Sequence, residues 1–346
     1  MSSQPAPPPV PEDFPDGDSF SSYLSGLGIT AWEDSTKKLF FQALRAASSD
    51  ANVLITGESG TGKDCLASFI HSHSRRREHP FVHVNAASIP EALFESELFG
   101  YAPGSFTGGH LSGHRGLARE ASGGTLYLDE IGELSPALQT KLLQFIQEHT
   151  ARSVGSAQTE LLDLRIIAAT NRDLEEMVAQ GLFRRDLFYR LNIISFFTLP
   201  LRQRKKDLLG LITHLSQINS ERFHITKKFS QDALDFLASR PWSGNLREVE
   251  NFMERLYVLE DEPVITAKLL ETRYSFPALK PAAKRSKPAI LPLAEAAERF
   301  EGEYIRQALM ELRSEDRAAE ALGLEIGQLK EKMREHGICY GKDEEP

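Results

Sequence analysis

Apolar runs of strand length alternate with helical patterns through the first two hundred residues. The runs lie at 53–56, 81–84, 125–128, 164–169 and 193–199. Several of them are rich in β-branched or aromatic residues, which is typical of buried strands. A helix predicted between two of the runs begins with Ser135 and Pro136 and carries its apolar residues on one face. Strands that alternate with helices predict an α/β fold with a mostly parallel sheet covered on both faces.

The pattern changes after about residue 200, where the strand-like runs stop and helical periodicity takes over. A helix predicted from Ser230 ends before Pro241. Asn245, with Glu248 three residues later, has the spacing of a capping box and predicts the start of another helix. Residues 201–275 are therefore expected to form a small helical domain of their own.

Proline-rich segments mark two breaks in the chain. Residues 1–22 contain six of the eighteen prolines, show no periodicity and are predicted to be a disordered tail. Residues 276–292 contain four more prolines, at a spacing that prevents regular structure, and are predicted to be a linker. Residues 293–346 then carry three helical patterns, the last two at 316–322 and 325–336. The predicted folded parts are 23–200, 201–275 and 293–346.

Composition narrows the class of protein. The 346 residues include 40 Lys and Arg against 49 Asp and Glu, a formal net charge of −9, which excludes a uniformly basic surface for indiscriminate nucleic-acid binding. The two cysteines, Cys65 and Cys339, are too few for a disulfide framework or a cysteine zinc site, which favours a reducing compartment. Neither a signal-peptide pattern nor a long apolar stretch is present, so we expect a cytoplasmic protein without membrane contact.

A glycine-rich loop follows the first apolar run and leads into a helical pattern. Its residues are Gly57, Glu58, Ser59, Gly60, Thr61, Gly62, Lys63 and Asp64. Glycines let backbone N–H groups curl around phosphate oxygens, and the N-terminus of the following helix adds a favourable dipole. Lys63 is expected to reach the outer phosphates of a nucleotide. The residue after this lysine is usually Ser or Thr, which ligates Mg²⁺, whereas here it is Asp64.

Two acids follow the apolar run at 125–128. In a phosphate-loop enzyme, the first acid at such a strand end holds Mg²⁺ through water and the second polarises the attacking water. These roles fall to Asp129 and Glu130. Asn171 closes the next run and offers an amide that could sense the γ-phosphate. We therefore expect ATP and Mg²⁺ as cofactors.

These motifs and three further segments resemble those of the AAA+ ATPase activators of sigma-54 RNA polymerase, the bacterial enhancer-binding proteins. That family characteristically has an acid where Asp64 stands. The further segments are SELFG at 96–100 with GSFTGG at 104–109, FRRDLFYRLN at 183–192, and WSGNLRE at 242–248. The resemblance extends from about residue 25 to the C-terminus. It implies an AAA+ fold with a helical lid, ATP hydrolysis in a hexameric ring, and sigma-54 RNA polymerase as partner.

The resemblance also implies roles for single residues of the ATP site. Lys63, Asp129 and Glu130 would carry the phosphate, metal and water-activating roles. Asn85 fits the asparagine that holds the catalytic glutamate back until the nucleotide state changes. On the sequence alone, an amide that caps a turn at the end of a strand explains Asn85 about as well.

Three arginines lie in the matched segments. Arg184 and Arg190 would reach into the site of the neighbouring subunit, where a finger supplied in trans is worth roughly three to five orders of magnitude in rate. Arg247 would contact the γ-phosphate from the lid and couple hydrolysis to lid motion. Activity would therefore require a ring.

The segment 104–109 resembles the surface loop with which the family grips sigma-54. Phe106 and Thr107 would form its exposed tip, and the flanking glycines would act as a hinge. Ser105 and Gly109 stand where the family usually has alanine. The implied function is remodelling of the closed promoter complex, driven by ATP hydrolysis. An AAA+ ATPase that remodels another client is the alternative.

The C-terminal helices resemble the factor-for-inversion-type helix-turn-helix that such activators place on upstream DNA. Residues 317–323 match its second helix, and the third helix offers the DNA-binding candidates Gln328, Lys330, Lys332 and Arg334. Residues 293–346 hold 8 basic and 14 acidic residues, a net charge of −6, which opposes approach to phosphates. Reliance on a partner for DNA binding is therefore a competing interpretation.

Control is expected to come from outside the chain. The first 22 residues are too few for a receiver or ligand-sensing domain. A separate inhibitory protein, expression level, or hetero-oligomerisation with a related activator would then regulate the homo-oligomeric ring.

Overall fold

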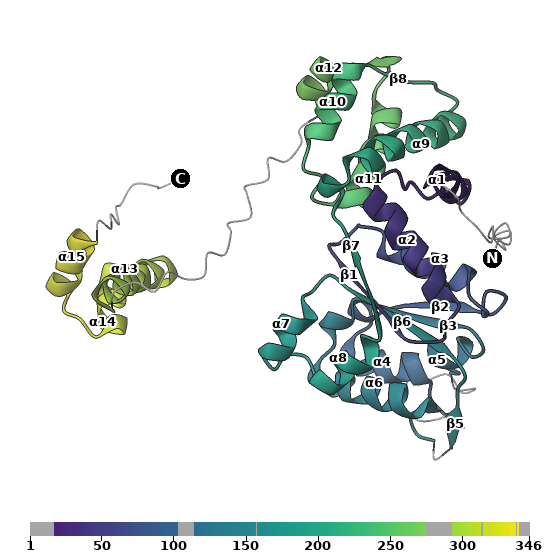
Figure 1. The fold of residues 1–346 in the computed structure, drawn as a ribbon. Helices are drawn as coiled ribbons and strands as arrows, with labels where there is room; N and C mark the ends of the chain where they lie inside the picture. Colours follow the sequence, from purple (N-terminus) through teal and green to yellow (C-terminus); the bar gives the residue numbers. More distant parts are fainter. Residues whose placement is uncertain are drawn as a thin grey trace. The chain divides into compact units, whose positions relative to one another are not determined.

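The computed structural model of the chain describes residues 17–102, 114–156, 158–274, 293–312, 314–336 and 338. Two compact units, residues 1–277 and residues 278–346, are described separately (Figure 1). Among the described residues, no helix is long and apolar enough to cross a membrane.

A five-stranded parallel sheet forms the centre of the first unit, as the alternating pattern predicts (Figure 1). The strand order is β2-β3-β6-β1-β7. The strands are β1 (Val53–Gly57), β2 (Phe81–Asn85), β3 (Thr125–Asp129), β6 (Arg165–Thr170) and β7 (Ile194–Thr198). Because every neighbouring pair is parallel, all five strands end at the same edge of the sheet, and that edge carries the phosphate loop and the two acids.

Helices cover both faces of this sheet. Successive strand residues alternate between the two cores, since Leu54 packs on one face while Val53 and Ile55 pack on the other. Helices α1, α2 and α3 line one face, and helices α4 to α8 line the other. Their bounds are α1 (Gly17–Gly26), α2 (Asp34–Ala47), α3 (Lys63–Ser72), α4 (Glu91–Phe99), α5 (Leu117–Glu120), α6 (Pro136–Glu148), α7 (Leu174–Ala179) and α8 (Arg185–Leu191). Single-turn helices lie at η1 (Ala86–Ser88) and η2 (Ile131–Glu133).

The N-terminal boundary differs from the prediction. Residues 1–22 are expected to be a disordered tail, but α1 begins at Gly17, and its Phe20 and Leu24 are buried against α2. The prediction is therefore wrong for residues 17–22, because two apolar side chains one helical turn apart find a core that composition alone does not reveal. Residues 1–16 lie outside the described part of the chain.

A short antiparallel ladder was not expected from the sequence. It joins β4 (Thr150–Arg152) to β5 (Thr159–Leu161). Both strands have three residues, and all of β5 is exposed, so no apolar alternation marks them.

The helical domain after the sheet has the predicted character and carries one extra ladder. Its elements are η3 (Leu201–Gln203), α9 (Lys205–Phe223), β8 (Lys228–Phe229), α10 (Gln231–Ser239), α11 (Asn245–Leu259), β9 (Val264–Ile265) and α12 (Ala267–Arg273). The predicted N-cap at Asn245 is one residue too late. Gly244 is the N-cap, and Glu248 accepts its N–H at 2.7 Å.

The second unit is a bundle of three helices, α13 (Leu293–Leu312), α14 (Glu315–Leu322) and α15 (Ile326–Glu335). Its core contains Ile305, Leu309, Ala318, Leu329 and Met333 among others. Gly323 ends α14 in the left-handed conformation that suits glycine, with φ of 69°. The predicted linker at 276–292 lies wholly outside the described residues.

Candidate nucleotide site

The glycine-rich loop lies between the end of β1 and the start of α3. Lys63 is the first residue of α3 and is buried, and its Nζ donates hydrogen bonds to the carbonyl oxygens of Gly57 and Glu58, at 3.2 and 3.3 Å. The ammonium group therefore lies at the centre of the loop, at the positive end of the α3 dipole. This arrangement has the geometry of an anion site built for phosphates.

The helical domain is hydrogen-bonded to the backbone of this loop. Three successive loop carbonyls accept hydrogen bonds from it. The pairs are Asn245 Nδ2 to Ser59 O at 2.9 Å, Leu246 N–H to Gly60 O at 2.8 Å, and Arg204 Nη2 to Thr61 O at 2.7 Å. Gly60 has φ of +73°, and a Cβ there would lie 2.4 Å from the carbonyl oxygen of Gly244. The loop and the lid therefore fit together only with glycine at this position.

An ion pair adds a second link between loop and lid. Arg202 in η3 donates to both carboxylate oxygens of Glu58, at 2.6 and 2.7 Å. This bidentate hydrogen bonding lowers the pKa of Glu58 below its ordinary value. Asn245 joins the same contact region, because its Oδ1 accepts the N–H of Leu201 at 2.8 Å. Sequence reasoning missed Arg202, Arg204 and Asn245 as site residues, although the first two begin a basic run directly after the last strand.

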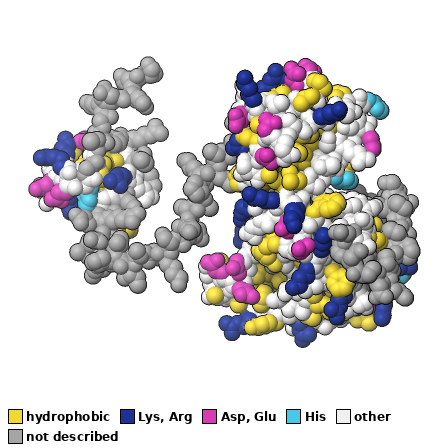
Figure 2. All heavy atoms as spheres, turned by 45° about the horizontal axis from the view of Figure 1, so that its top comes forward, with side chains coloured by type: hydrophobic (Ala, Val, Ile, Leu, Met, Phe, Trp, Pro, Cys, Tyr) yellow, Lys and Arg dark blue, Asp and Glu magenta, His cyan; other side chains and the backbone are white. Residues whose placement is uncertain are grey.

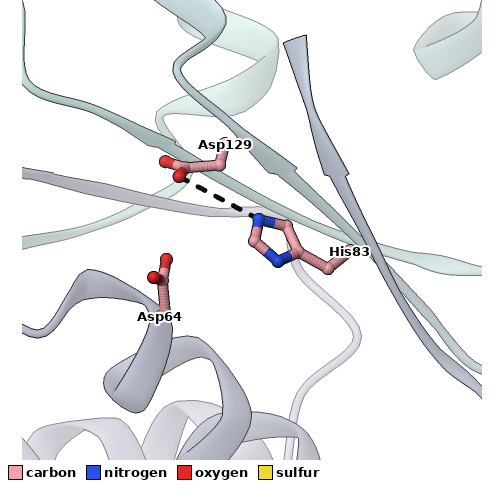
Figure 3. Close-up of side chains that lie close together, drawn as sticks. All are labelled: Asp64, His83 and Asp129. Atoms are coloured by element: carbon pink, nitrogen blue, oxygen red, sulfur yellow. Dashed lines mark ion pairs between the residues drawn. The ribbon is translucent and has the colours of Figure 1, made fainter. Parts of the chain in front are cut away.

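Asp64 and Asp129 face each other across the end of the sheet, together with His83 (Figure 3). Tyr127 in β3 donates a hydrogen bond of 2.6 Å from its hydroxyl to Asp64 Oδ1, and Asp129 Oδ1 accepts the N–H of Glu130 at 2.9 Å. Burial, and then the neighbouring Asp64 carboxylate, raise the pKa of Asp129. Two close carboxylate groups form a donor set that fits a divalent cation such as Mg²⁺.

Glu130 begins the turn after β3 with left-handed backbone angles, φ 54° and ψ 43°. Its Oε2 accepts the N–H of Asn171 at 3.3 Å, so the structure brings these two predicted residues together. Asn85, in register with Asp129 on the neighbouring strand, accepts the N–H of Ala87 and caps η1. That is the turn-capping alternative for Asn85, and a restraining contact with Glu130 stays a prediction.

The three predicted arginines occupy different places. Arg247 is exposed on α11, and its Cβ lies 3.4 Å from a Cβ built on Gly60, beside the phosphate loop. Arg184 is the N-cap residue of α8, and its guanidinium pairs with Asp186 at 2.8 Å on the surface. The carbonyl of Arg190 accepts a hydrogen bond from Asn52, which precedes β1. The backbone of Arg190 therefore lies at the end of β1 opposite the phosphate loop.

Residues 103–113, which include the predicted sigma-54 contacts Phe106 and Thr107, lie outside the described residues. The chain on either side of them is described. Tyr101 and His114 exchange two backbone hydrogen bonds, at 2.9 and 3.0 Å, in an antiparallel bridge. The chain therefore enters and leaves this segment at two hydrogen-bonded neighbouring residues, Tyr101 and His114.

The predicted DNA-binding residues lie in the second unit on α15, and three of them already contact other residues of that unit. Gln328 accepts the N–H of Glu325 as part of a capping box. Lys330 pairs with Glu315 at 3.2 Å, and Lys332 pairs with Glu301. On the face drawn in Figure 2, Lys and Arg side chains of this unit lie among Asp and Glu side chains.

A phosphate loop between β1 and α3, acids at the end of β3 and a helical lid bonded to the loop define an AAA+ ATPase domain. The Sigma-54 interaction domain family matches residues 29–197, and the AAA+ ATPase lid domain family matches residues 202–287. The chain belongs to the family of sigma-54-dependent AAA+ transcriptional regulators.

Similar proteins include regulators that are longer than the part this chain matches. The chain is 44% identical over 299 residues to the nitrogen fixation protein AnfA of Azotobacter vinelandii, a match that covers 86% of this chain and 55% of AnfA. It is 36% identical over 343 residues to the DNA-binding transcriptional regulator NtrC of Rhizobium meliloti, covering 90% of this chain and 70% of NtrC. The structure of NtrX from Brucella abortus in complex with ATP superposes with a TM-score of 0.65 at 32% identity, covering 92% of this chain and 73% of NtrX.

Proposed function

We propose that this protein hydrolyses ATP in a ring and uses the energy to remodel the closed complex of sigma-54 RNA polymerase. The observation that carries the proposal is the attachment of the lid to the phosphate loop. A change of the loop backbone at Ser59, Gly60 or Thr61 on nucleotide binding or hydrolysis would be passed to the lid, which is hydrogen-bonded to these three carbonyls. Chemistry at the phosphates is thereby coupled to movement of a whole domain.

ATP would bind with its phosphates in the loop 57–64, cradled by backbone N–H groups and by Lys63. Mg²⁺ would supply the charge that neutralises the phosphates, held by Asp129 with Asp64 beside it. Glu130 would orient and polarise the attacking water, and Asn171, in contact with Glu130, would report the γ-phosphate to it. The ATP-bound NtrX structure supports nucleotide binding by this fold.

Ring assembly would complete the site. Arg184 is exposed and Arg190 lies at the far end of β1 from the phosphate loop, which supports action on a neighbouring subunit's site. We therefore propose a hexamer in which these arginines act in trans. A related activator could substitute for some of the subunits, and a separate inhibitory protein could restrain assembly.

Phe106 and Thr107 would contact sigma-54. The bridge between Tyr101 and His114 supports this role, because it anchors both ends of the segment on the ATPase domain. Movement of that domain would then be passed directly to the segment. Complex formation between the full chain and purified sigma-54, with ADP and aluminium fluoride as a transition-state mimic, tests this step. Co-elution that depends on Thr107 supports the contact, and co-elution of Thr107→Ala at the wild-type level refutes it.

The ion pairs of the C-terminal unit favour a second candidate function beside direct DNA binding. In this alternative the activator depends on a partner to reach DNA. Lys330 and Lys332 are neutralised by Glu315 and Glu301. If these pairs limit DNA affinity, Glu301→Gln should strengthen binding to an upstream activator site and steepen its salt dependence, because it releases one cation for phosphate contact. Fluorescence anisotropy with a salt titration measures both quantities. Equal affinity of wild type and Glu301→Gln, with no salt dependence, would favour the partner.

A further inference from the structure

Two buried hydroxyl groups meet between the last strand of the sheet and the phosphate loop. Thr198 ends β7 and Thr61 lies in the loop, and the two residues are 3% and 2% exposed. Their Oγ1 atoms are 2.7 Å apart. β7 lies beside β1, the strand that enters the loop (Figure 1), and a Cβ built on Gly57 would lie 2.1 Å from Thr198 Oγ1. Thr198 therefore packs directly against the start of the loop.

The hydrogen bonds of this pair have a direction. A hydroxyl group carries one proton and can accept two bonds. Thr61 donates its proton to the carbonyl oxygen of Glu58 at 2.7 Å, whereas the carbonyl oxygen of Thr56 lies farther from Thr198 Oγ1, at 3.2 Å. Both 2.7 Å contacts are satisfied at once when Thr198 donates to Thr61 and Thr61 donates to Glu58. The two hydroxyl groups thus form a chain of hydrogen bonds that runs from β7 into the loop.

This chain of hydrogen bonds ends on a carbonyl that also holds the loop lysine. Lys63 Nζ donates to Glu58 O at 3.3 Å and to Gly57 O at 3.2 Å. The direction of the Glu58 carbonyl therefore helps to fix the place of the ammonium group, and Thr61 helps to fix the direction of that carbonyl. Hydrogen bonds in a buried chain strengthen one another, so the loss of one member weakens the rest.

The loop residue Thr61 is held by the lid as well as by the sheet. Its backbone carbonyl accepts the hydrogen bond from Arg204 at 2.7 Å, while its side chain is bonded to Thr198. Thr198 closely precedes η3, the first element of the lid. The pair of hydroxyl groups therefore connects the loop to the place where the sheet passes into the lid.

We propose that Thr198 is a positioning residue for ATP binding, which acts through the hydroxyl of Thr61 on the loop carbonyl that holds Lys63. Thr198 is buried behind the loop, so it acts through these residues and not by contact with the nucleotide. The inference rests on the proposed function, in which this loop holds the phosphates of ATP. The competing arrangement is a pair that only satisfies two buried hydroxyl groups and adds to the stability of the core.

The test compares Thr198→Ala with Thr198→Ser in the full chain. Both variants lose the threonine methyl group, and only Thr198→Ala loses the hydroxyl. The readout is the Kd for a non-hydrolysable fluorescent ATP analogue in the presence of Mg²⁺. We expect the Kd to rise about five- to tenfold in Thr198→Ala, which is the worth of one buried hydrogen bond. Thr198→Ser should restore it to within about twofold of the wild-type value.

Thr125→Ala is the matched control. Thr125 is fully buried at the opposite end of the sheet, at the start of β3, where its Oγ1 lies 2.9 Å from Nδ1 of His71. Its replacement should lower the free energy of unfolding in urea about as much as Thr198→Ala does, and it should leave the Kd unchanged. Urea unfolding also establishes that each variant is folded. If Thr198→Ala does not fold, Thr61→Ala against Thr61→Ser tests the same chain of hydrogen bonds from the loop side.

A double-mutant cycle tests whether the two hydroxyl groups act together. If they form one chain, the Thr61→Ala/Thr198→Ala double variant should bind the analogue no more weakly than the weaker single variant. Losses of binding free energy that simply add would overturn the inference.

Two further results would also overturn it, namely equal Kd values for Thr198→Ala and Thr198→Ser, or the same loss of affinity in Thr125→Ala. A wild type that does not bind the analogue would contradict both the proposed ATPase function and the inference. Equally tight binding by the wild type and by Thr198→Ala would contradict only the inference.

Discussion

The hydroxyl of Tyr127 in β3 donates a 2.6 Å hydrogen bond to Oδ1 of Asp64, the acid that follows the phosphate-loop lysine. This contact joins the strand that carries Asp129 to the helix that carries Lys63. Burial, and then the bond to Asp64, raise the pKa of Tyr127, so the phenol stays protonated and donates. The carboxylate of Asp64, which stands where phosphate loops usually have Ser or Thr, is therefore held in one direction beside the strand that carries Asp129.

Tyr127→Phe should remove this orientation with little change in shape. The ring remains in the core, but the hydrogen bond to a charged acceptor is lost, so we expect a stability loss of about 1 kcal/mol. Affinity for the cation that accompanies ATP should fall with it. Urea unfolding and metal titration measure the two effects. A Tyr127→Phe protein that binds the cation as tightly as the wild type would show that the bond does not orient Asp64.

The side chain of Asn245 makes two bonds that a substitution can separate, one within the lid to Leu201 and one to the phosphate loop at Ser59. The Asn245→Asp variant keeps the acceptor for the N–H of Leu201 but loses the donor to Ser59 O, and it brings a second carboxylate near Glu58. We expect a folded protein whose ATP hydrolysis is uncoupled from lid movement, seen as ATP turnover without sigma-54 remodelling. Asn245→Gly, which tolerates the φ of 54° but removes both bonds, should cost more stability. Normal remodelling by Asn245→Asp would contradict the coupling role.

The Glu58–Arg202 pair predicts a pH dependence. The pKa of Glu58 is lowered in the folded protein, so the pair stabilises the fold above the unfolded-state pKa of about 4.5 and loses this contribution as pH falls through the lower folded-state value. Because both groups are partly exposed, Arg202→Ala should cost only about 0.5–1 kcal/mol at pH 7. The difference from wild type should shrink below pH 4.5. Arg222→Ala, which removes the exposed pair with Glu254, is the control. If the loss of unfolding free energy in Arg202→Ala grew at low pH, the result would contradict this role of the Glu58–Arg202 pair.

The trans role of Arg184 predicts complementation between two inactive proteins. Lys63→Ala lacks a working phosphate site but supplies Arg184, and Arg184→Ala has the opposite defect. Each alone should hydrolyse almost no ATP, while an equal mixture should recover activity at about a quarter of its interfaces. Steady-state ATP turnover across mixing ratios measures this. A mixture as inactive as its components would place Arg184 in its own subunit's site.

Strong local patterns allowed much of the fold to be predicted. The five apolar runs became five parallel strands with ends within about one residue, because β-branched runs between turns have few alternatives. The phosphate loop, Asp129 and Glu130 could be expected to share one edge of the sheet, because each lies at the end of a strand and parallel strands end together. Glu130 and Asn171 therefore meet, although 41 residues separate them.

Other features depend on tertiary contacts that no local pattern encodes. Asn245 has capping-box spacing, yet its side chain bonds across domains to Ser59 and Leu201. Phe20 and Leu24 follow a proline-rich stretch that resembles a tail, but they are buried against α2. The approach of His83 to Asp129 depends on which strand adjoins β3, and this order emerges only from the assembled sheet.

We propose that ATP hydrolysis at this site drives promoter opening through the segment that contains Thr107. The most direct measurement is ATP-dependent open-complex formation by purified sigma-54 RNA polymerase, scored by permanganate reactivity of the melted DNA. Wild type should open the promoter, Lys63→Ala should neither hydrolyse ATP nor open it, and Thr107→Ala should hydrolyse ATP without opening it. Promoter opening by Thr107→Ala at the wild-type level, or by Lys63→Ala, would contradict the account.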